Sequence, residues 1–121
     1  MSERRKYRRI KIKIKFIYKV MGVKGEVALA SVDLGGGGIR LYLDKEIERG
    51  TIVELGLGLP EDKQLIFSLG KVVWQKKVTG DSGAKRARYL TGLEFINLGI
   101  TNRTRLVSFV HERLKDSKDA T

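Results

Sequence analysis

The stretch "IKIKIKFIYKV", residues 10–20, alternates apolar and basic side chains with a period of two. Because successive side chains of a β-strand point to opposite faces, this period separates the two kinds. Ile10, Ile12, Ile14 and Phe16 fall on one face, and Lys11, Lys13 and Lys15 fall on the other. The stretch therefore predicts a strand with one apolar face and one basic face.

Five further strand-like stretches follow, separated by turns rich in glycine or broken by the single proline. They are GEVALASVDL (25–34), GIRLYLD (38–44), TIVELGLGL (51–59), QLIFSLGKVVWQKKV (64–78) and AKRARYLTGLEFINL (84–98). Short strands at this spacing are typical of a closed or nearly closed antiparallel barrel. We therefore predict an all-β fold with a six-stranded antiparallel β-barrel over residues 10–98.

The C-terminal residues have a different period. Leu106, Val110 and Leu114 recur every four residues, which predicts an amphipathic helix over 101–115 with Thr101 or Asn102 as its N-cap. No internal repeat or linker divides the chain. Residues 1–121 are therefore expected to form one domain, with a mobile basic arm over 1–9 ahead of the barrel and helix.

The net charge of +11 is concentrated near the N-terminus, where ten Lys or Arg and no acid lie between Arg4 and Lys24. A concentrated positive field indicates an anionic partner, although it also suits a solvated strand face. The chain has no cysteine, which excludes disulfides and thiolate sites. It has no apolar run of the roughly 20 residues that a membrane helix needs. We expect a cytoplasmic protein that does not insert into membranes.

Catalysis finds little support in the residues. The single histidine, His111, lies in the predicted helix, and no stretch has the spacing of a metal site. The glycine run Gly35–Gly38 lacks the Lys-Ser/Thr of a P-loop and precedes a strand. We therefore expect neither an enzyme, nor a metal site, nor a cofactor.

Binding is better supported. The arm holds two interleaved R-x-x-x-R pairs, Arg4 with Arg8 and Arg5 with Arg9. The planar guanidinium can bind a phosphate or the O6 and N7 edge of guanine with two hydrogen bonds, and it can stack on a base. After Asp33, a turn without side chains lets backbone groups approach an anion or a flat ring. The alternative is a plain turn, in which the glycines supply positive φ.

These residues resemble the PilZ family, bacterial receptors for cyclic di-GMP. The family pattern R-x-x-x-R resembles "RKYRR" at 5–9, and its (D/N)-x-S-x-x-G resembles "DLGGGG" at 33–38. The stretch "GLEF" at 92–95 is similar to a late family strand, and the predicted barrel with its trailing helix also fits. The family's serine is Gly35 here, and losing one hydrogen bond to a charged group lowers affinity about ten- to a hundredfold.

The resemblance implies that cyclic di-GMP binds on the outer surface of the barrel. The ligand-binding residues it implies, together with our own expectation for the tryptophan, are Arg4, Arg5, Arg8, Arg9, Asp33, Gly35, Gly37, Gly38 and Trp74. The arginines would clamp one guanine and a phosphate, and Asp33 with the glycine turn would hold the other guanine. Arg4 and Arg8 would support a second ligand copy. Trp74 would stack on a guanine, unless it is a core residue of the barrel.

The resulting function would be a signalling switch, in which the arm becomes ordered on ligand binding and a downstream protein reads the change. A homo-oligomer is compatible with this reading. A second hypothesis is a nucleic-acid-binding small barrel, favoured by the lysine face and by Tyr7, Tyr18, Tyr42 and Trp74. The acid at the glycine turn disfavours it. A third is a PilZ-like scaffold that binds only protein, which the missing serine permits.

Overall fold

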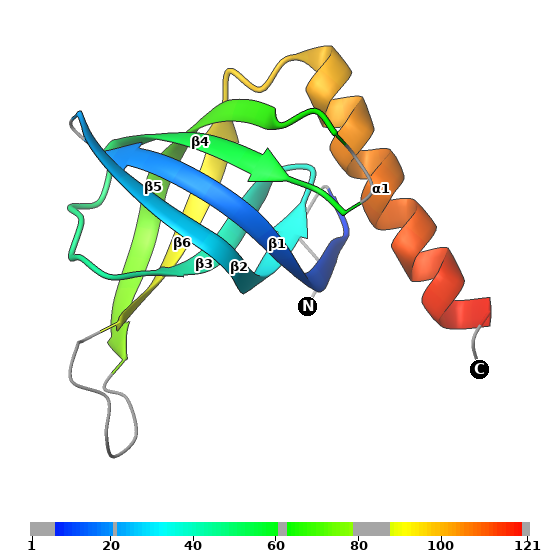
Figure 1. The fold of residues 1–121 in the computed structure, drawn as a ribbon, viewed down its shortest axis with the longest axis horizontal. Coiled ribbons are helices and arrows are strands. Elements are labelled where there is room, and N and C mark those ends of the chain that lie inside the picture. Colours follow the sequence, from blue (N-terminus) through cyan, green and yellow to red (C-terminus); the bar gives the residue numbers. More distant parts are fainter. Residues whose placement is uncertain (1–6, 21, 61–62, 79–87, 120–121) are drawn as a thin grey trace, which may run out of the picture.

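Six antiparallel strands close a barrel, and one helix follows them, as predicted (Figure 1). The computed structural model describes residues 7–20, 22–60, 63–78 and 88–119. The elements are β1 (Arg9–Val20), β2 (Val23–Gly35), β3 (Gly38–Leu43), β4 (Ile52–Gly58), β5 (Ile66–Val78), β6 (Arg88–Ile96) and α1 (Ile100–Asp119).

The strands do not follow one another around the barrel in sequence order. The order is β1-β2-β3-β6-β5-β4, and β4 returns to pair with β1. Strand β3 thus has β6 as its second neighbour, although β4 follows it in the chain. This arrangement places the hairpin of β2 and β3 against the last strand, β6.

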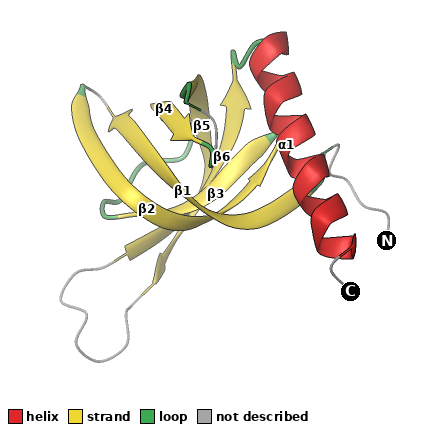
Figure 2. Cartoon of the chain, turned by 45° about the vertical axis from the view of Figure 1, so that its right-hand side comes forward, coloured by secondary structure: helices red, strands yellow, loops and turns green. Residues whose placement is uncertain are grey.

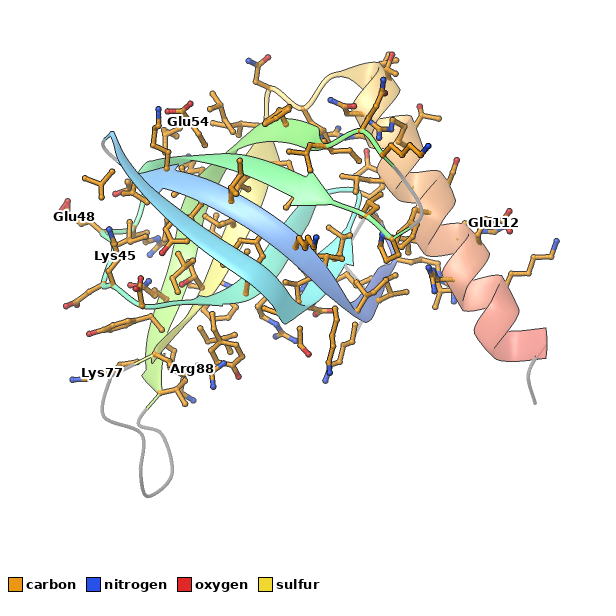
Figure 3. All side chains as sticks on the ribbon, viewed as in Figure 1. Lys45, Glu48, Glu54, Lys77, Arg88 and Glu112 are labelled. Atoms are coloured by element: carbon orange, nitrogen blue, oxygen red, sulfur yellow. The ribbon has the colours of Figure 1, made fainter. Side chains whose placement is uncertain are left out.

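Strand β1 has the alternation that the sequence predicts. Ile14 and Phe16 are 1% and 2% exposed, whereas Lys11, Lys13 and Lys15 are exposed. The strand begins one residue earlier than expected, because Arg9 pairs with Gly35 of β2. The boundary drawn between a basic arm and the barrel after residue 9 is therefore wrong. Charged side chains labelled in Figure 3, such as those of Glu54 and Lys77, project away from the barrel ribbon.

Helix α1 starts at Ile100 and continues to Asp119, beyond the predicted end at 115. Gly99 has a φ of 86°, and its carbonyl accepts a hydrogen bond from the Arg103 amide at 3.0 Å. Gly99 therefore takes the N-cap position, which glycine tolerates well. The prediction that Thr101 or Asn102 caps the helix is wrong, because both lie inside its first turn.

The helix covers one end of the barrel (Figure 2). Leu106 is fully buried in the same apolar cluster as the strand residues, and Val110 is 3% exposed. The helix contacts β1 and β2, the two strands that also carry the arginine segment and the glycine turn. Its apolar face therefore closes the core next to the predicted site.

Tyr18 is buried in this barrel, and its hydroxyl donates a hydrogen bond to Asp44 Oδ1 at 2.9 Å. Burial, and then the hydrogen bond and charge of Asp44, raise the pKa of Tyr18 to about 12. In the unfolded chain, the Tyr18 hydroxyl ionises near its ordinary pKa of 10.0. The folded state keeps the Tyr18 proton to a higher pH than the unfolded state does. The protonated hydroxyl therefore stabilises the fold fully below pH 10, and this stabilisation is lost as the pH rises toward 12.

We expect Tyr18→Phe to lower the free energy of unfolding by about 1 kcal/mol at neutral pH, through the lost hydrogen bond. Between pH 10 and 12, the wild-type protein should lose stability faster than the variant, because phenylalanine at position 18 has no hydroxyl to ionise in the unfolded chain. Urea unfolding of both proteins at pH 9 and pH 11 measures the difference. A difference in unfolding free energy between the two proteins that is the same at both pH values would contradict the raised pKa of Tyr18.

Candidate functional site

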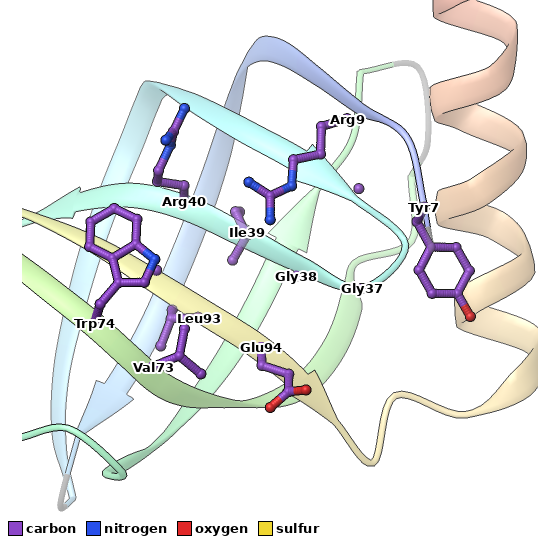
Figure 4. Close-up of a pocket in the computed structure, with 12 residues that line it drawn as sticks. Tyr7, Arg9, Gly37, Gly38, Ile39, Arg40, Val73, Trp74, Leu93 and Glu94 are labelled. Atoms are coloured by element: carbon purple, nitrogen blue, oxygen red, sulfur yellow. The ribbon is translucent and has the colours of Figure 1, made fainter. Parts of the chain in front are cut away.

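A cavity of about 380 Å³ lies on the outer surface of the barrel, beside the glycine turn (Figure 4). We call it the first pocket. It is lined by five residues of the predicted site, Arg9, Gly35, Gly37, Gly38 and Trp74. Further lining residues come from three strands and the N-terminal segment, among them Tyr7, Arg40, Gly92 and Glu94. In Figure 4, Arg40 and Trp74 lie at one end of this cavity, and Tyr7 lies at the other, toward helix α1.

The arginine segment and the glycine turn are neighbours because of the register of β1 on β2. Arg9 pairs with Gly35, at the point where β2 enters the turn. The guanidinium Nη1 of Arg9 lies 3.7 Å from Asp33 Oδ2, and both side chains remain partly accessible. Two segments that are 24 residues apart in the sequence therefore form one surface.

Arg40 completes this charged group. Hairpin register places it directly opposite Asp33, and its Nη2 donates a hydrogen bond to Asp33 Oδ2 at 3.0 Å. The same carboxylate oxygen thus faces two guanidinium groups. Arg40 is not among the residues predicted from the sequence. The signal was present, because opposite charges at equal distances from a glycine turn face each other in a two-stranded hairpin.

The four glycines serve close packing, and the positive-φ interpretation is wrong. Among the described residues, the glycines with positive φ are Gly22, Gly50 and Gly99, all outside the run. A Cβ added at Gly35 would lie 2.6 Å from the Arg8 carbonyl oxygen, and one at Gly38 would collide with the Leu93 carbonyl. The chain therefore needs glycine here because other backbone segments pass too close for any side chain.

The remaining two glycines lie under an aromatic ring. A Cβ at Gly36 would lie 2.8 Å from Tyr7 Cδ1 and 2.7 Å from Val107 Cγ2 of α1, and one at Gly37 would lie 3.1 Å from the Tyr7 ring. Arg103 of α1 reaches the same ring, with its guanidinium carbon 5.5 Å from the centroid. Tyr7 is thus packed between the glycine turn and the helix.

Trp74 lies on the outer surface, 40% exposed, so the alternative of a core tryptophan is wrong. The register of β5 on β6 shifts between Val72 and Trp74, which leaves Val73 as an extra residue. Before this bulge Val72 is buried, and after it Gln75 hydrogen-bonds the fully buried Thr91 at 2.9 Å. The extra residue reverses the alternation and directs Trp74 outward.

Gly92 accommodates the indole of Trp74. The two residues pair across β5 and β6, and a Cβ at Gly92 would lie 2.6 Å from Trp74 Cε2. Gly92 also pairs with Arg40 on its other side. A glycine between an arginine and a tryptophan therefore forms the floor of this end of the pocket.

The other predicted residues lie elsewhere. Asp33 lines an adjacent cavity, and its Oδ2 faces Arg9 and Arg40, which both line the first pocket. Arg8 lines a small cavity of about 140 Å³ against α1, together with Tyr7 and His111. Arg4 and Arg5 lie outside the residues that the structure describes.

Within the described ranges, no group of three or more His, Cys, Asp or Glu side chains is placed to hold a metal ion. Among the helical residues that the structure describes, none forms a helix long and apolar enough to span a membrane. The arrangement on the surface can offer guanidinium forks, an exposed indole and backbone groups without side chains in front of them. These are groups that bind phosphates and flat heterocycles.

Comparisons with known proteins agree with this fold. The family model described as PilZ domain matches residues 3–112. Among solved structures, the Bacillus subtilis inhibitor of motility MotI/DgrA superposes with a TM-score of 0.75 at 18% identity, over 95% of this chain and 53% of that one. The PilZ domain of Escherichia coli YcgR, solved with c-di-GMP, has a TM-score of 0.67 at 14% identity, over 98% of this chain and 100% of that one.

The MrkH–c-di-GMP complex of K. pneumonia has a TM-score of 0.74 at 16% identity, over 100% of this chain and 57% of that one. This chain thus spans about half the length of MotI and MrkH. At these identities, the structural likeness shows the fold. A comparison with curated proteins finds none that matches.

Proposed function

The chain belongs to the PilZ domain family, and on that premise we propose that it is a non-catalytic receptor for cyclic di-GMP. Two structures with the same fold, YcgR and MrkH, were solved with this ligand, which supports the proposal. The observation that carries it in this chain is the first pocket, where Arg9, the glycine turn and Trp74 meet on the outer surface. The ligand is a dianion with two guanines, which suits this combination of groups.

Each group has a proposed role. Arg9 binds a phosphate or the O6 and N7 edge of a guanine, since its guanidinium is partly exposed beside the turn. Trp74 stacks on a guanine with its exposed indole. The glycines let the ligand approach the backbone closely. Asp33 accepts from a guanine N1–H through Oδ1, because Arg9 and Arg40 both contact Oδ2.

The proposed switch rests on Tyr7, which lies inside the R-x-x-x-R segment. Its ring lies against Gly36 and Gly37, and Arg103 Nη1 donates a hydrogen bond to its hydroxyl at 3.5 Å. We infer that a ligand drawing the arginines onto the pocket orders the arm and shifts Tyr7 against α1. The helix surface is then what a downstream protein reads.

A titration with cyclic di-GMP tests the receptor function. Trp74 is the only tryptophan of the chain, so its fluorescence reports directly on the first pocket. We expect a saturable change with cyclic di-GMP at tens of micromolar or below, and a much weaker one with GMP. If calorimetry and fluorescence both show no binding at these concentrations, the proposal is wrong.

Hydrogen exchange with and without cyclic di-GMP tests the switch. Ligand should increase the protection of residues 2–9 and change that of the first two turns of α1. Tyr7→Ala should keep protection of the arm but abolish the change in α1, because the contact with Arg103 is removed. Equal protection of residues 2–9 in both states would rule the switch out.

Restoring the family serine at position 35 is expected not to tighten binding. A side chain there would begin 2.6 Å from the Arg8 carbonyl oxygen and 3.1 Å from Arg9 Cγ, so it would displace the arginine segment. We expect Gly35→Ser to lower the affinity for cyclic di-GMP by about tenfold. Calorimetric titration of the variant measures this, and a gain in affinity would show that the segment moves away when ligand binds.

A further inference from the structure

A second and larger cavity, of about 640 Å³, opens on the outer surface between β2 and β3. The two strands pair only at Asp33–Arg40 and Leu34–Ile39. Beyond these two pairs β2 continues to pair with β1, and β3 continues to pair with β6. We call this cavity the β2–β3 groove. Its size lies within the roughly 300–1,000 Å³ that is usual for small-molecule sites.

The groove is basic on its rim. Lys11 and Lys13 of β1 are exposed along one side, and Arg40 of β3 lines the side shared with the first pocket. The guanidinium of Arg88 lies 4.0 Å from the centroid of the Tyr42 ring, which lines the groove. Arg88 is the first residue of β6 and is labelled in Figure 3. Lys11, Lys13 and Arg40 therefore line the opening from β1 and β3, and Arg88 of β6 lies against Tyr42, which also lines it.

One carboxylate lines the groove, and it is already neutralised. Asp33 Oδ2 accepts the hydrogen bond from Arg40 at 3.0 Å and lies 3.7 Å from Arg9. The acid that disfavoured a phosphate-bearing partner in the sequence thus does not face the groove as a free charge. The net field at the opening is positive and attracts an anion.

The floor of the groove is apolar. Val32 is buried, and Ile12 and Leu90 are half-buried. Ser31, which pairs with Lys13, adds an exposed hydroxyl at the rim. A ligand that fits must therefore carry negative charge at one end and a flat, weakly polar surface at the other. Nucleotides have this combination.

We propose that the β2–β3 groove binds a phosphate-bearing nucleotide at a site separate from the first pocket. The phosphate contacts Lys11 and Lys13, and the base lies on the floor beside Tyr42. The nucleotide is either free or one residue of a single strand. The lysines repeat every two residues along β1, about 6.7 Å apart, so successive phosphates of an extended strand can meet them in turn.

The test uses UMP, a ten-nucleotide oligothymidylate and inorganic phosphate, none of which offers a guanine to the first pocket. Amide chemical shifts of ¹⁵N-labelled protein should move at Ser31 and Tyr42 in the groove, and not at Gly37 and Gly92 in the first pocket. UMP binding supports a free nucleotide. Binding of the oligothymidylate alone, with affinity falling steeply with salt, supports a single strand.

A pair of double variants separates this site from general attraction to a basic protein. Lys11→Ala with Lys13→Ala should weaken binding by at least about tenfold, through two lost charge-assisted contacts. Lys63→Ala with Lys71→Ala removes the same charge from exposed positions outside the groove and should change affinity less than about twofold. Equal weakening by both pairs, shifts confined to Gly37 and Gly92, inorganic phosphate binding as well as UMP, or no shift at all would each overturn the proposal.

The groove can be tested apart from the receptor function, because Lys11, Lys13 and Tyr42 do not line the first pocket. The Lys11 and Lys13 double variant is expected to keep its affinity for cyclic di-GMP within about twofold, as read by Trp74 fluorescence. A protein that binds cyclic di-GMP but not UMP or oligothymidylate refutes only the groove. The opposite result refutes only the receptor.

Discussion

Arg9→Ala should weaken cyclic di-GMP binding by at least about tenfold, because one charge-assisted contact contributes about 1.5–3 kcal/mol. Arg9 lines the first pocket and pairs with Gly35, where β2 enters the glycine turn. Its partner in the motif, Arg5, should show a loss of the same size. Titration by calorimetry, with Trp74 fluorescence as a second readout, measures both.

Asp33→Ala should cause a loss as large, for a different reason. The carboxylate holds Arg9 and Arg40 at 3.7 Å and 3.0 Å, so its removal leaves two guanidinium groups close together without their shared counter-charge. Asp33→Asn keeps an acceptor of the same size. If Asp33 accepts a hydrogen bond from guanine, the asparagine variant should recover part of the affinity that alanine loses.

Arg49→Ala is the matched control for these variants. It removes the same charge from an exposed turn and lines none of the cavities described above. Its affinity for cyclic di-GMP should remain within about twofold of the wild type. If Arg9→Ala and Arg49→Ala weaken binding equally, the affinity depends on the net charge of the protein, and the site is placed incorrectly.

Gly38→Ala should destabilise the fold by about 3 kcal/mol, because its Cβ would collide with the Leu93 carbonyl in the neighbouring strand. A flexible side chain can move aside, but this obstacle is the backbone of β6. Strands β3 and β6 must therefore separate locally. This breaks hydrogen bonds of the ladder that residues 38–43 form with β6. Urea unfolding, monitored by circular dichroism, measures the loss.

Gly37→Ala is the control from the same turn. Its Cβ would meet the edge of the Tyr7 ring at 3.1 Å, and a ring at the surface can shift by a few tenths of an ångström. We expect a loss below about 1 kcal/mol. Similar losses for both variants would mean that conformational entropy, which is common to both glycines, explains the run better than close packing does.

Periodicity alone predicted much of the fold. Alternation over residues 10–20 predicted which face of β1 is buried, and the spacing of the turns predicted six strands. The arginine and glycine segments also stood out in the sequence, and the register of β1 on β2 brings them together at the first pocket. These properties are local, so the order of residues is enough to specify them.

Partners across strands were decided by the tertiary structure. Whether Trp74 faces the core or the solvent depends on one extra residue at Val73, and a shift of one residue exchanges the two faces of a strand. The purpose of the glycine run depends on what passes beside it, which is the arginine segment, Tyr7 and β6. Arg40 joins the site only because the hairpin sets it opposite Asp33. Sequence thus determined which side chains are available for binding, and packing between distant segments determined which of them meet.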